Sequence, residues 1–259
     1  MPKKSAIAKN RSVLTKTKEE IEIMKKAGDI CAKVLRKVLE NTRAGATGQD
    51  LDKLAQNELQ LHGATPSFMT VEGYRHAICT TINEQIVHGI PTARILAQGD
   101  IVGIDIGALY NGYHSDMALT VPIGNVSAKT LEFLETGRRT LQEAIKKTYI
   151  GKRIGDISST IQKGIEGAGY STVKSLTGHG IGRQLHEEPM IPGFGREGTG
   201  PTILENMVLA IEVIYTEGAG EVKLEADGWT ISSVDGGLGG LFEKTVAVTK
   251  DGPIVLTPY

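Results

Sequence analysis

The sequence predicts an α+β fold, in which amphipathic helices are followed by strand-rich segments twice along one chain. Helical hydrophobic spacing precedes β-prone runs in both halves. Residues 45–63 also align without gaps with residues 151–169, which places Asp50 on Asp156. Chance matching over so short a stretch is the alternative. Similar halves without a linker predict one domain with internal pseudo-symmetry over residues 17–259, and a chain of 259 residues can bury its core.

The helices are predicted in order along the chain. Thr17 and Glu20 form a capping-box pair, which indicates a helix start. Apolar residues then recur at helical spacing as far as Val38. Further helices are predicted over residues 51–59, 127–148 and 157–165, and strands over residues 77–121 and 173–259.

Residues 100–121 predict a β-hairpin. Asn111-Gly112 is a strong signal for a two-residue turn, because both turn positions need positive φ. The flanking runs are apolar and β-prone, so Tyr110 is expected to pair with Tyr113. That register fixes which side chains of the two strands share a face.

Asp105 and Asp116 fall on the same face of this hairpin as diagonal neighbours, with Cβ atoms roughly 7 Å apart. His114 shares the face as a near neighbour. Asp105 interrupts an apolar run, where a buried carboxylate must be paired, hydrogen-bonded or metal-bound. The alternative is a strand whose aspartates face water.

Further candidate ligands lie in the second half. Glu212 and Glu243 are lone acids inside apolar strands, and His179 and His186 lie in the glycine-rich segment GHGIGRQLHEEP. Taken singly, each acid fits a strand edge or a salt bridge, and each histidine fits a structural role. Together with the aspartates they form an oxygen-rich set that suits two divalent ions about 3.5–4 Å apart. Carboxylates favour Mn, Mg or Fe(II), and an imidazole admits Co or Zn.

These residues, in this order, resemble the pita-bread metallopeptidases of family M24 from about residue 19 to residue 257. Within that group, four segments resemble type I methionine aminopeptidase: INEQIVHGIP (82–91), GHGIGRQLHEEP (178–189), GTGPTILENMVLAIE (198–212) and DGWT (227–230). The resemblance implies pseudo-two-fold halves with a curved antiparallel sheet covered by helices.

The resemblance also implies a metal centre with two divalent ions, whose identity (Co, Mn, Fe(II) or Zn) stays open. Asp116 and Glu243 match ligands that bridge the ions, and Glu212 also matches a proton shuttle. The full set of implied ligands is Asp105, Asp116, His179, Glu212 and Glu243.

The implied activity is removal of the initiator methionine from nascent polypeptides with a small second residue, by attack of a water or hydroxide that bridges the metals. His88 matches a histidine that contacts the scissile amide, and His186 matches one that stabilises the oxyanion. The positions that match the walls of the methionine pocket are Phe68, Tyr74, Cys79, Leu185 and Trp229.

The sequence departs from the usual residues of these relatives at a few positions near the motifs. Proline is usual at Val213 and histidine at Lys244, and the surroundings of Leu241 are commonly more polar. Proline and histidine are common where this chain has Arg75 and Glu72. The effect of these changes on substrate and metal preference is open.

Other functions of the same fold are weighed against this interpretation. The segment DIGALYNGYHSDMALT also resembles X-Pro dipeptidases and aminopeptidase P, but those enzymes usually carry a large N-terminal domain. A non-catalytic binding protein of this fold is disfavoured because all implied ligands are present. A type II enzyme is disfavoured because it carries a helical insert between the positions of His186 and Glu212, which are close here.

Composition narrows the setting. A net charge of -1 argues against DNA binding. Cys31 and Cys79 are too few for a disulfide framework, and no membrane span or signal peptide is apparent, so a cytoplasmic protein is expected. Residues 1–16 are basic and predict a flexible tail, with contact to ribosomal RNA as the alternative. Family resemblance suggests a monomer.

Overall fold

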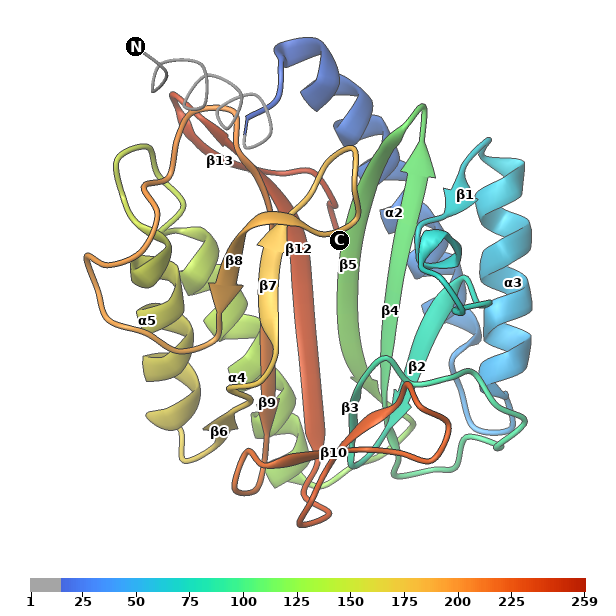
Figure 1. Ribbon diagram of the computed structural model, residues 1–259. Coiled ribbons are helices and arrows are strands. Elements are labelled where there is room, and N and C mark those ends of the chain that lie inside the picture. Colours follow the sequence, from blue (N-terminus) through green and yellow to red (C-terminus); the bar gives the residue numbers. More distant parts are fainter. Residues whose placement is uncertain (1–14) are drawn as a thin grey trace, which may run out of the picture.

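The computed structural model describes residues 15–259 and has a large curved sheet at its centre (Figure 1). Helices are α2 (Lys18–Asn41), α3 (Gly48–Leu61), α4 (Ala128–Ile145) and α5 (Ile154–Glu166), with a short 3-10 helix, η1 (Phe68–Thr70). The strands of the first half are β1 (Thr65–Pro66), β2 (Ile78–Ile82), β3 (Gln85–Val87), β4 (Ile101–Tyr110) and β5 (Tyr113–Pro122). Those of the second half are β6 (Ser171–Thr172), β7 (Thr177–Gly180), β8 (Glu187–Pro192), β9 (Val208–Thr216), β10 (Val222–Leu224), β11 (Ile231–Ser233), β12 (Gly239–Thr249) and β13 (Gly252–Val255).

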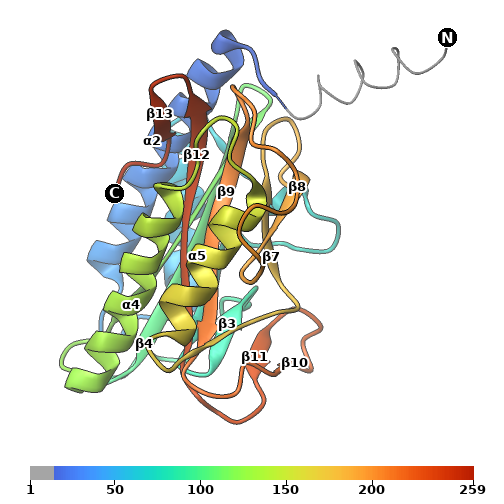
Figure 2. The ribbon, with the colours of Figure 1, turned by 90° about the vertical axis from the view of Figure 1, so that its left-hand side faces the viewer.

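The main sheet is antiparallel and runs in the order β1-β4-β5-β12-β9-β7-β8, with β2 on β4, β6 on β9 and β13 on β12. A small sheet, β10-β11-β3, lies at one end. Helices α2, α4 and α5 cover one side of the main sheet, whereas its edge strands β7 and β8 bend towards the opposite side, where β10 also lies (Figure 2). Helices therefore cover one face of the sheet, and a functional site can form on the other face.

The two halves are related as the sequence predicts. Helix α2 packs on β4 and β5 and is flanked by α3, and helix α4 packs on β9 and β12 and is flanked by α5. The α+β fold with pseudo-two-fold halves and a helix-covered antiparallel sheet is thus confirmed. Strands β5 and β12 join the halves at the middle of the sheet.

The short internal repeat marks equivalent helix starts. The Asp50 N–H donates to the Thr47 hydroxyl at 3.2 Å, and the Asp156 carboxylate accepts from the Arg153 N–H at 2.8 Å, in each case between the N-cap residue and the third residue of the helix. These contacts satisfy groups that a helix N-terminus leaves unpaired. The aligned segments therefore have the same local structure, at α3 and at α5.

The predicted start of the first helix is also confirmed. The Thr17 hydroxyl accepts from the Glu20 N–H at 3.2 Å, and the Glu20 carboxylate accepts from the Thr17 N–H at 2.6 Å. The apolar side of α2 is buried from Met24 to Val38, where it faces the sheet. Burial of this stripe, more than helix propensity, stabilises α2.

Most of the predicted basic tail, residues 1–14, lies outside the described residues. Lys16, which the sequence analysis assigned to that tail, is instead part of the folded domain. It is 8% exposed, and its backbone N–H donates to Asn206 O at 2.8 Å. No helix within residues 15–259 has an apolar stretch long enough to cross a membrane.

Helix α4 approaches the sheet closely at Gly137. A Cβ atom at this position would lie 2.5 Å from the Tyr215 hydroxyl and 2.5 Å from Phe242 Cδ2. Both rings are fully buried, and the Tyr215 hydroxyl donates to Phe133 O at 2.6 Å, so neither can move aside without loss. The glycine therefore sets the distance between α4 and strands β9 and β12.

Gly137→Ala is expected to destabilise the protein by about 1–3 kcal/mol through overpacking. In an open helix the same change would stabilise by about 0.5–1 kcal/mol. Denaturant unfolding measures the change in the free energy of unfolding. Arg138→Ala, at the exposed neighbouring position, is the control. A Gly137→Ala protein as stable as the wild type would contradict the close packing described.

Candidate active site

The hairpin register is the one predicted from its turn. Tyr110 pairs with Tyr113, Asp105 lies opposite Ala118, and Asp116 lies opposite Gly107. Both turn residues have positive φ, 48° at Asn111 and 80° at Gly112. The two aspartates therefore share one face of the sheet, as expected.

Strand pairing extends this face into a row of side chains across the sheet. Asp105 lies opposite Cys79 on one side and Ala118 on the other, and Ala118 lies opposite Glu243. Glu243 in turn lies opposite Glu212. Directly opposed residues share a face, so three acids from three strands project to the same side.

A second row, two residues further along, supplies the remaining groups. Asp116 lies here on β5, and the Thr245 hydroxyl bridges its backbone by accepting from Asp116 N–H at 2.9 Å and donating to Asp116 O at 2.7 Å. Thr245 lies opposite Ala210, and Ala210 lies opposite His179. Two adjacent rows thus bring together all five residues that the resemblance implies as ligands.

A group of three buried side chains could hold a metal ion. One ligand atom each from Asp116, His179 and Glu243 lies within 4.8 Å of the others. The acceptors Asp105 Oδ1, Asp116 Oδ1 and Glu243 Oε1 are buried and meet no hydrogen-bond donor among residues 15–259. Unpaired buried carboxylates are costly, and a divalent cation is the partner that would satisfy several at once. The residues present therefore fit a metal centre.

The His179 ring is oriented for ligation. Its Nδ1 lies 2.9 Å from Gly180 O, and since a carbonyl only accepts, Nδ1–H is the donor. This fixes the tautomer and leaves the Nε2 lone pair free, as is common for metal-binding histidines. The His186 ring stands edge-on to it, with centroids 4.6 Å apart and planes at 76°.

Burial and mutual repulsion change the ionisation of the carboxylates. Burial raises the pKa of Asp105 to about 7. Burial, together with the negative charge of Asp105, raises the pKa of Asp116, Glu212 and Glu243 well above the usual range. Four neighbouring carboxyl groups with little access to solvent resist ionisation unless cations are bound.

His88 and Trp229 are brought to the site by the small sheet. Val87 on β3 lies opposite Ile231 on β11, which places the chain just before β11 beside His88. The Asp227 carboxylate accepts from Trp229 N–H at 2.8 Å and from Thr230 N–H at 2.8 Å, a turn that fixes the tryptophan. His88 has a φ of 57°, a conformation that is uncommon outside glycine and is found at functional sites.

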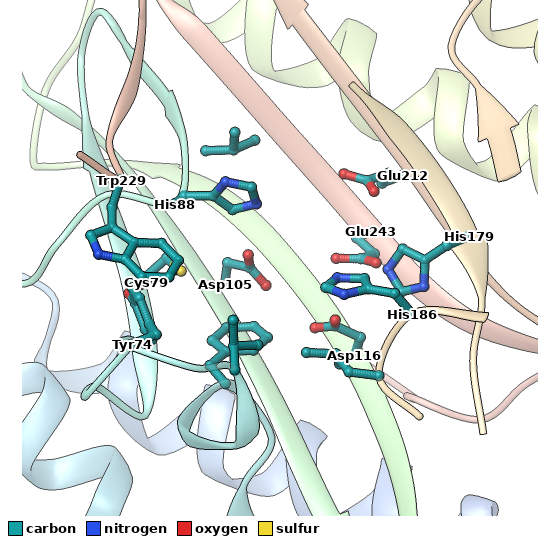
Figure 3. Close-up of a pocket in the computed structure, with 14 residues that line it drawn as sticks. Tyr74, Cys79, His88, Asp105, Asp116, His179, His186, Glu212, Trp229 and Glu243 are labelled. Atoms are coloured by element: carbon teal, nitrogen blue, oxygen red, sulfur yellow. Dashed lines mark hydrogen bonds between the residues drawn. The ribbon is translucent and has the colours of Figure 1, made fainter. Parts of the chain in front are cut away.

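The predicted site residues all line one cavity of about 140 Å³ (Figure 3). Figure 3 shows Tyr74, Cys79 and Trp229 on one side, and Asp116, His179 and Glu243 on the other, with Asp105 between them. The complete lining is Phe68, Val71, Tyr74, Cys79, Val87, His88, Asp105, Asp116, His179, Leu185, His186, Glu212, Trp229 and Glu243. Of these, Val71 and Val87 were missed, and adjacency to His88 was the one signal for Val87.

The wall opposite the acids is aromatic and closely packed. Tyr74 stands edge-on to Trp229, with centroids 5.1 Å apart, and edge-on to Phe68, with centroids 6.3 Å apart. The Tyr74 hydroxyl donates to Ile78 O at 2.9 Å and lies 3.1 Å from Cys79 Sγ. The cavity therefore combines a charged end with an apolar end.

His114 stays a near neighbour, as the hairpin predicts. It is buried behind the lining, where its Nδ1 lies 3.0 Å from the Ser67 hydroxyl. Burial lowers its pKa to about 4, so the ring is neutral.

The unusual residues beside the ligands do not enter the cavity. Val213 is buried in the core cluster that α4 and α5 form with the sheet, and Lys244 Nζ donates to Thr257 O at 3.0 Å. Arg75 and Glu72 are exposed on the loop that carries Tyr74. Of the five, Leu241 alone shares the site face of its strand with Glu243, and it packs with Ile86 and Val87.

The sequence model of metallopeptidase family M24 matches residues 22–250. The chain belongs to metallopeptidase family M24. It is accordingly a hydrolase of a family that binds divalent metal, and the buried Asp116, His179 and Glu243 group could hold such an ion.

Relatives of similar length are similar to this chain along nearly its whole sequence. It is 41% identical to the methionine aminopeptidase of Clostridium perfringens, covering 95% of this chain and 98% of the relative. It is 40% identical to methionine aminopeptidase 1 of Bacillus subtilis, covering 95% and 99%. The crystal structure of methionine aminopeptidase from Thermotoga maritima superposes with a TM-score of 0.93 at 38% identity, covering 95% of this chain and all of that one.

A prolidase is also similar. The prolidase from Pyrococcus furiosus superposes with a TM-score of 0.79 at 26% identity, covering 98% of this chain but 68% of the prolidase. The X-Pro alternative thus shares the fold, and the remaining part of the prolidase has no counterpart in the superposition.

The metal-free protein is expected to lose stability as pH rises from about 4 towards about 7 at this site. The folded-state pKa of Asp105 lies near 7, above the ordinary 3.8 of an aspartate, so the native state binds more protons in this window and stability falls with pH. Asp105→Asn removes that titration and should flatten the slope. Thermal unfolding of both metal-stripped proteins between about pH 4.5 and 7.5 measures the slope. Parallel curves for the two proteins would contradict the assignment.

Proposed function

We propose that this protein is a methionine aminopeptidase that removes the initiator methionine from nascent polypeptides with a small second residue. The observation that carries the proposal is one cavity with a carboxylate and histidine cluster at one end and a wall of aromatic and sulfur-containing side chains at the other. The relatives named methionine aminopeptidase, which match along nearly the whole chain, support it.

We assign Asp105, Asp116, His179, Glu212 and Glu243 as the residues that would hold two divalent ions. The support is the two rows of opposed side chains and the buried acceptors without donors. Such ions would polarise a substrate carbonyl and supply an activated water at neutral pH. Oxygen donors with one imidazole are compatible with Mn, Fe(II), Co or Zn.

The remaining polar residues are assigned to the substrate. His88 and His186 are exposed at the cavity mouth, where their N–H groups can reach the scissile amide and the developing oxyanion. Glu212 is half-buried, whereas Glu243 is 3% exposed, so Glu212 is the carboxylate better placed to move a proton between solvent and substrate.

The apolar end is assigned to the methionine side chain. Phe68, Tyr74 and Trp229 present ring edges and faces, and Cys79 and Leu185 complete the wall. A thioether makes favourable contacts with aromatic rings, worth about 0.3–1.5 kcal/mol each. A branched or charged side chain would fill this end less well.

The test is hydrolysis of Met-Ala-Ser by metal-stripped protein with Mn, Fe(II), Co or Zn added singly. Methionine release that requires metal is the expected result, and Met-Lys peptides should be cleaved about tenfold or more slowly, as expected when pocket size discriminates. Gly-Pro and Ala-Pro peptides are measured alongside. Cleavage of the proline peptides alone would indicate prolidase activity in place of methionine aminopeptidase activity.

Equal rates on Met-Ala and Met-Lys peptides would overturn the small-residue preference while leaving the aminopeptidase activity intact. No cleavage with any metal would overturn the proposed function.

His88→Ala is expected to keep its metals and lose about 100-fold or more in kcat, since a positioned hydrogen-bond or proton-transfer group contributes that much. Metal content by elemental analysis and peptide kinetics measure the two effects separately. The exposed His62→Ala is the matched control, since His62 ends α3 and does not line the cavity. Full activity of His88→Ala would refute the assigned role.

A reducing compartment such as the cytoplasm is proposed for the protein. Both cysteines within the described chain, Cys31 and Cys79, are free and buried. Burial raises the pKa of each thiol, which keeps both protonated and unreactive.

A further inference from the structure

A buried ion pair lies directly behind the part of the cavity wall that carries Leu185 and His186. The Lys16 ammonium is 2.6 Å from Glu187 Oε2, and the two side chains are 6% and 7% exposed. Lysine and glutamate are almost never so buried unless paired. The partners are 171 positions apart, so the contact ties the segment before α2 to the first residue of β8, where the loop from β7 ends.

The same carboxylate also closes the turn that holds the two cavity residues. Glu187 Oε1 accepts from the Gln184 N–H at 3.1 Å, and Leu185 and His186 lie between these residues. One oxygen therefore shapes the turn and the other fastens it to Lys16. The turn cannot shift without breaking one of these bonds.

Lys16 is itself held in place. Its backbone N–H donates to Asn206 O at 2.8 Å, just before β9. Glu20, in the first turn of α2, accepts from the Tyr113 hydroxyl at 2.6 Å and pairs with Arg183 of the same β7–β8 loop. Residues 16–20 thus contact Arg183 in the β7–β8 loop and Glu187 at the start of β8.

The close approach requires a glycine. A Cβ atom at Gly182 would lie 2.2 Å from Lys16 Cε and 2.8 Å from Lys16 Nζ. The aliphatic stem of the lysine therefore passes over the loop backbone itself. On the other side of the loop, Gly182 O accepts from the His114 N–H at 2.8 Å.

We propose that Lys16 is a positioning residue, which acts through Glu187 to hold His186 and Leu185 against the cavity; the kinetic part of this inference rests on the proposed function. Without the ammonium, Glu187 Oε2 loses its ion-pair partner, and the turn loses its buried contact to the N-terminal segment while the exposed Arg183–Glu20 pair stays. His186 is assigned to the oxyanion, so its displacement weakens an interaction made in the transition state. The effect is therefore on kcat more than on KM.

The kinetic test compares Lys16→Met, Lys16→Arg and Lys18→Met on Met-Ala-Ser with saturating metal. Lys16→Met should lower kcat about tenfold or more, with KM changed less than about threefold, because small displacements of a catalytic group have effects of this size. Lys16→Arg keeps the charge and should restore most of the loss. Lys18 is an exposed lysine of the same segment, and its change should leave the rate as it is.

A double variant separates positioning from the burial of an unpaired charge. Lys16→Met with Glu187→Gln leaves no charge to solvate, so a loss caused by charge burial alone would be relieved in it. Positioning predicts that the double variant stays as slow as Lys16→Met, because the turn is still unfastened. A double variant with wild-type kcat would overturn the proposal.

NMR of the His186 side chain tests the positioning role of Lys16 without any measurement of enzyme activity. The imidazole NMR signals of His186, assigned by their loss in His186→Asn, should broaden or split in Lys16→Met. They should stay sharp in Lys16→Arg and Lys18→Met. Unchanged His186 signals in Lys16→Met would overturn the proposal, while an inactive wild type would overturn the proposed function and leave this result to stand alone.

Discussion

Buried carboxylate oxygens without donors are the constraint on which the rest of the structure depends. Asp105, Asp116 and Glu243 each bury such an atom, and isolated charges in a dry interior are costly. A sheet can meet this constraint because opposed positions on neighbouring strands present side chains at a fixed spacing. Metal binding and stability are therefore coupled, and the metal-free protein holds a group of acids with raised pKa values that resist ionisation.

The position of β12 between β5 and β9 follows from the same constraint. Asp105 and Asp116 belong to the first half, and His179, Glu212 and Glu243 belong to the second, so the proposed metal centre lies where the halves meet. Helices on the opposite face exclude water from behind the acids, and α4 is held close to that face by the absence of a side chain at Gly137. The loops on the open face supply the apolar end of the cavity, to which Leu185 and Trp229 contribute.

Local rules were enough to predict part of this site from the sequence. The Asn111-Gly112 turn fixed the register of β4 and β5, and that register placed both aspartates on one face. Glu212 and Glu243 were identifiable because each interrupts an apolar strand. Their direct opposition was not predictable by such rules, because β9 and β12 are joined through the excursion of β10 and β11, and no tight turn sets their register.

Contacts between distant segments escaped sequence reasoning for a similar reason. Lys16 follows a run of basic residues and resembles solvated tail, and the partner that buries it comes 171 positions later. The positions of His88 and Trp229 relative to the acids came from family resemblance alone, since the pairing of β3 with β11 has no short-range signal. Sequence patterns predict on which face of a strand a side chain lies. Which residue lies opposite it on the neighbouring strand depends on the whole fold.

Successive side chains of a strand point to opposite faces of the sheet. This alternation determines whether the unusual residues Val213, Lys244 and Leu241 can reach the site. Val213 and Lys244 each follow a proposed ligand, so they point away from the site face and cannot coordinate an ion bound there. Burial lowers the pKa of Lys244 to about 8, and its amine donates to Thr257 O, which fastens the C-terminal segment to β12. Any influence of these residues on metal preference must pass through the position of the β9 and β12 backbones. Leu241 differs, because it shares the site face with Glu243 and packs in one cluster with Val87, next to His88, so its effect would fall on the part of the cavity that carries His88.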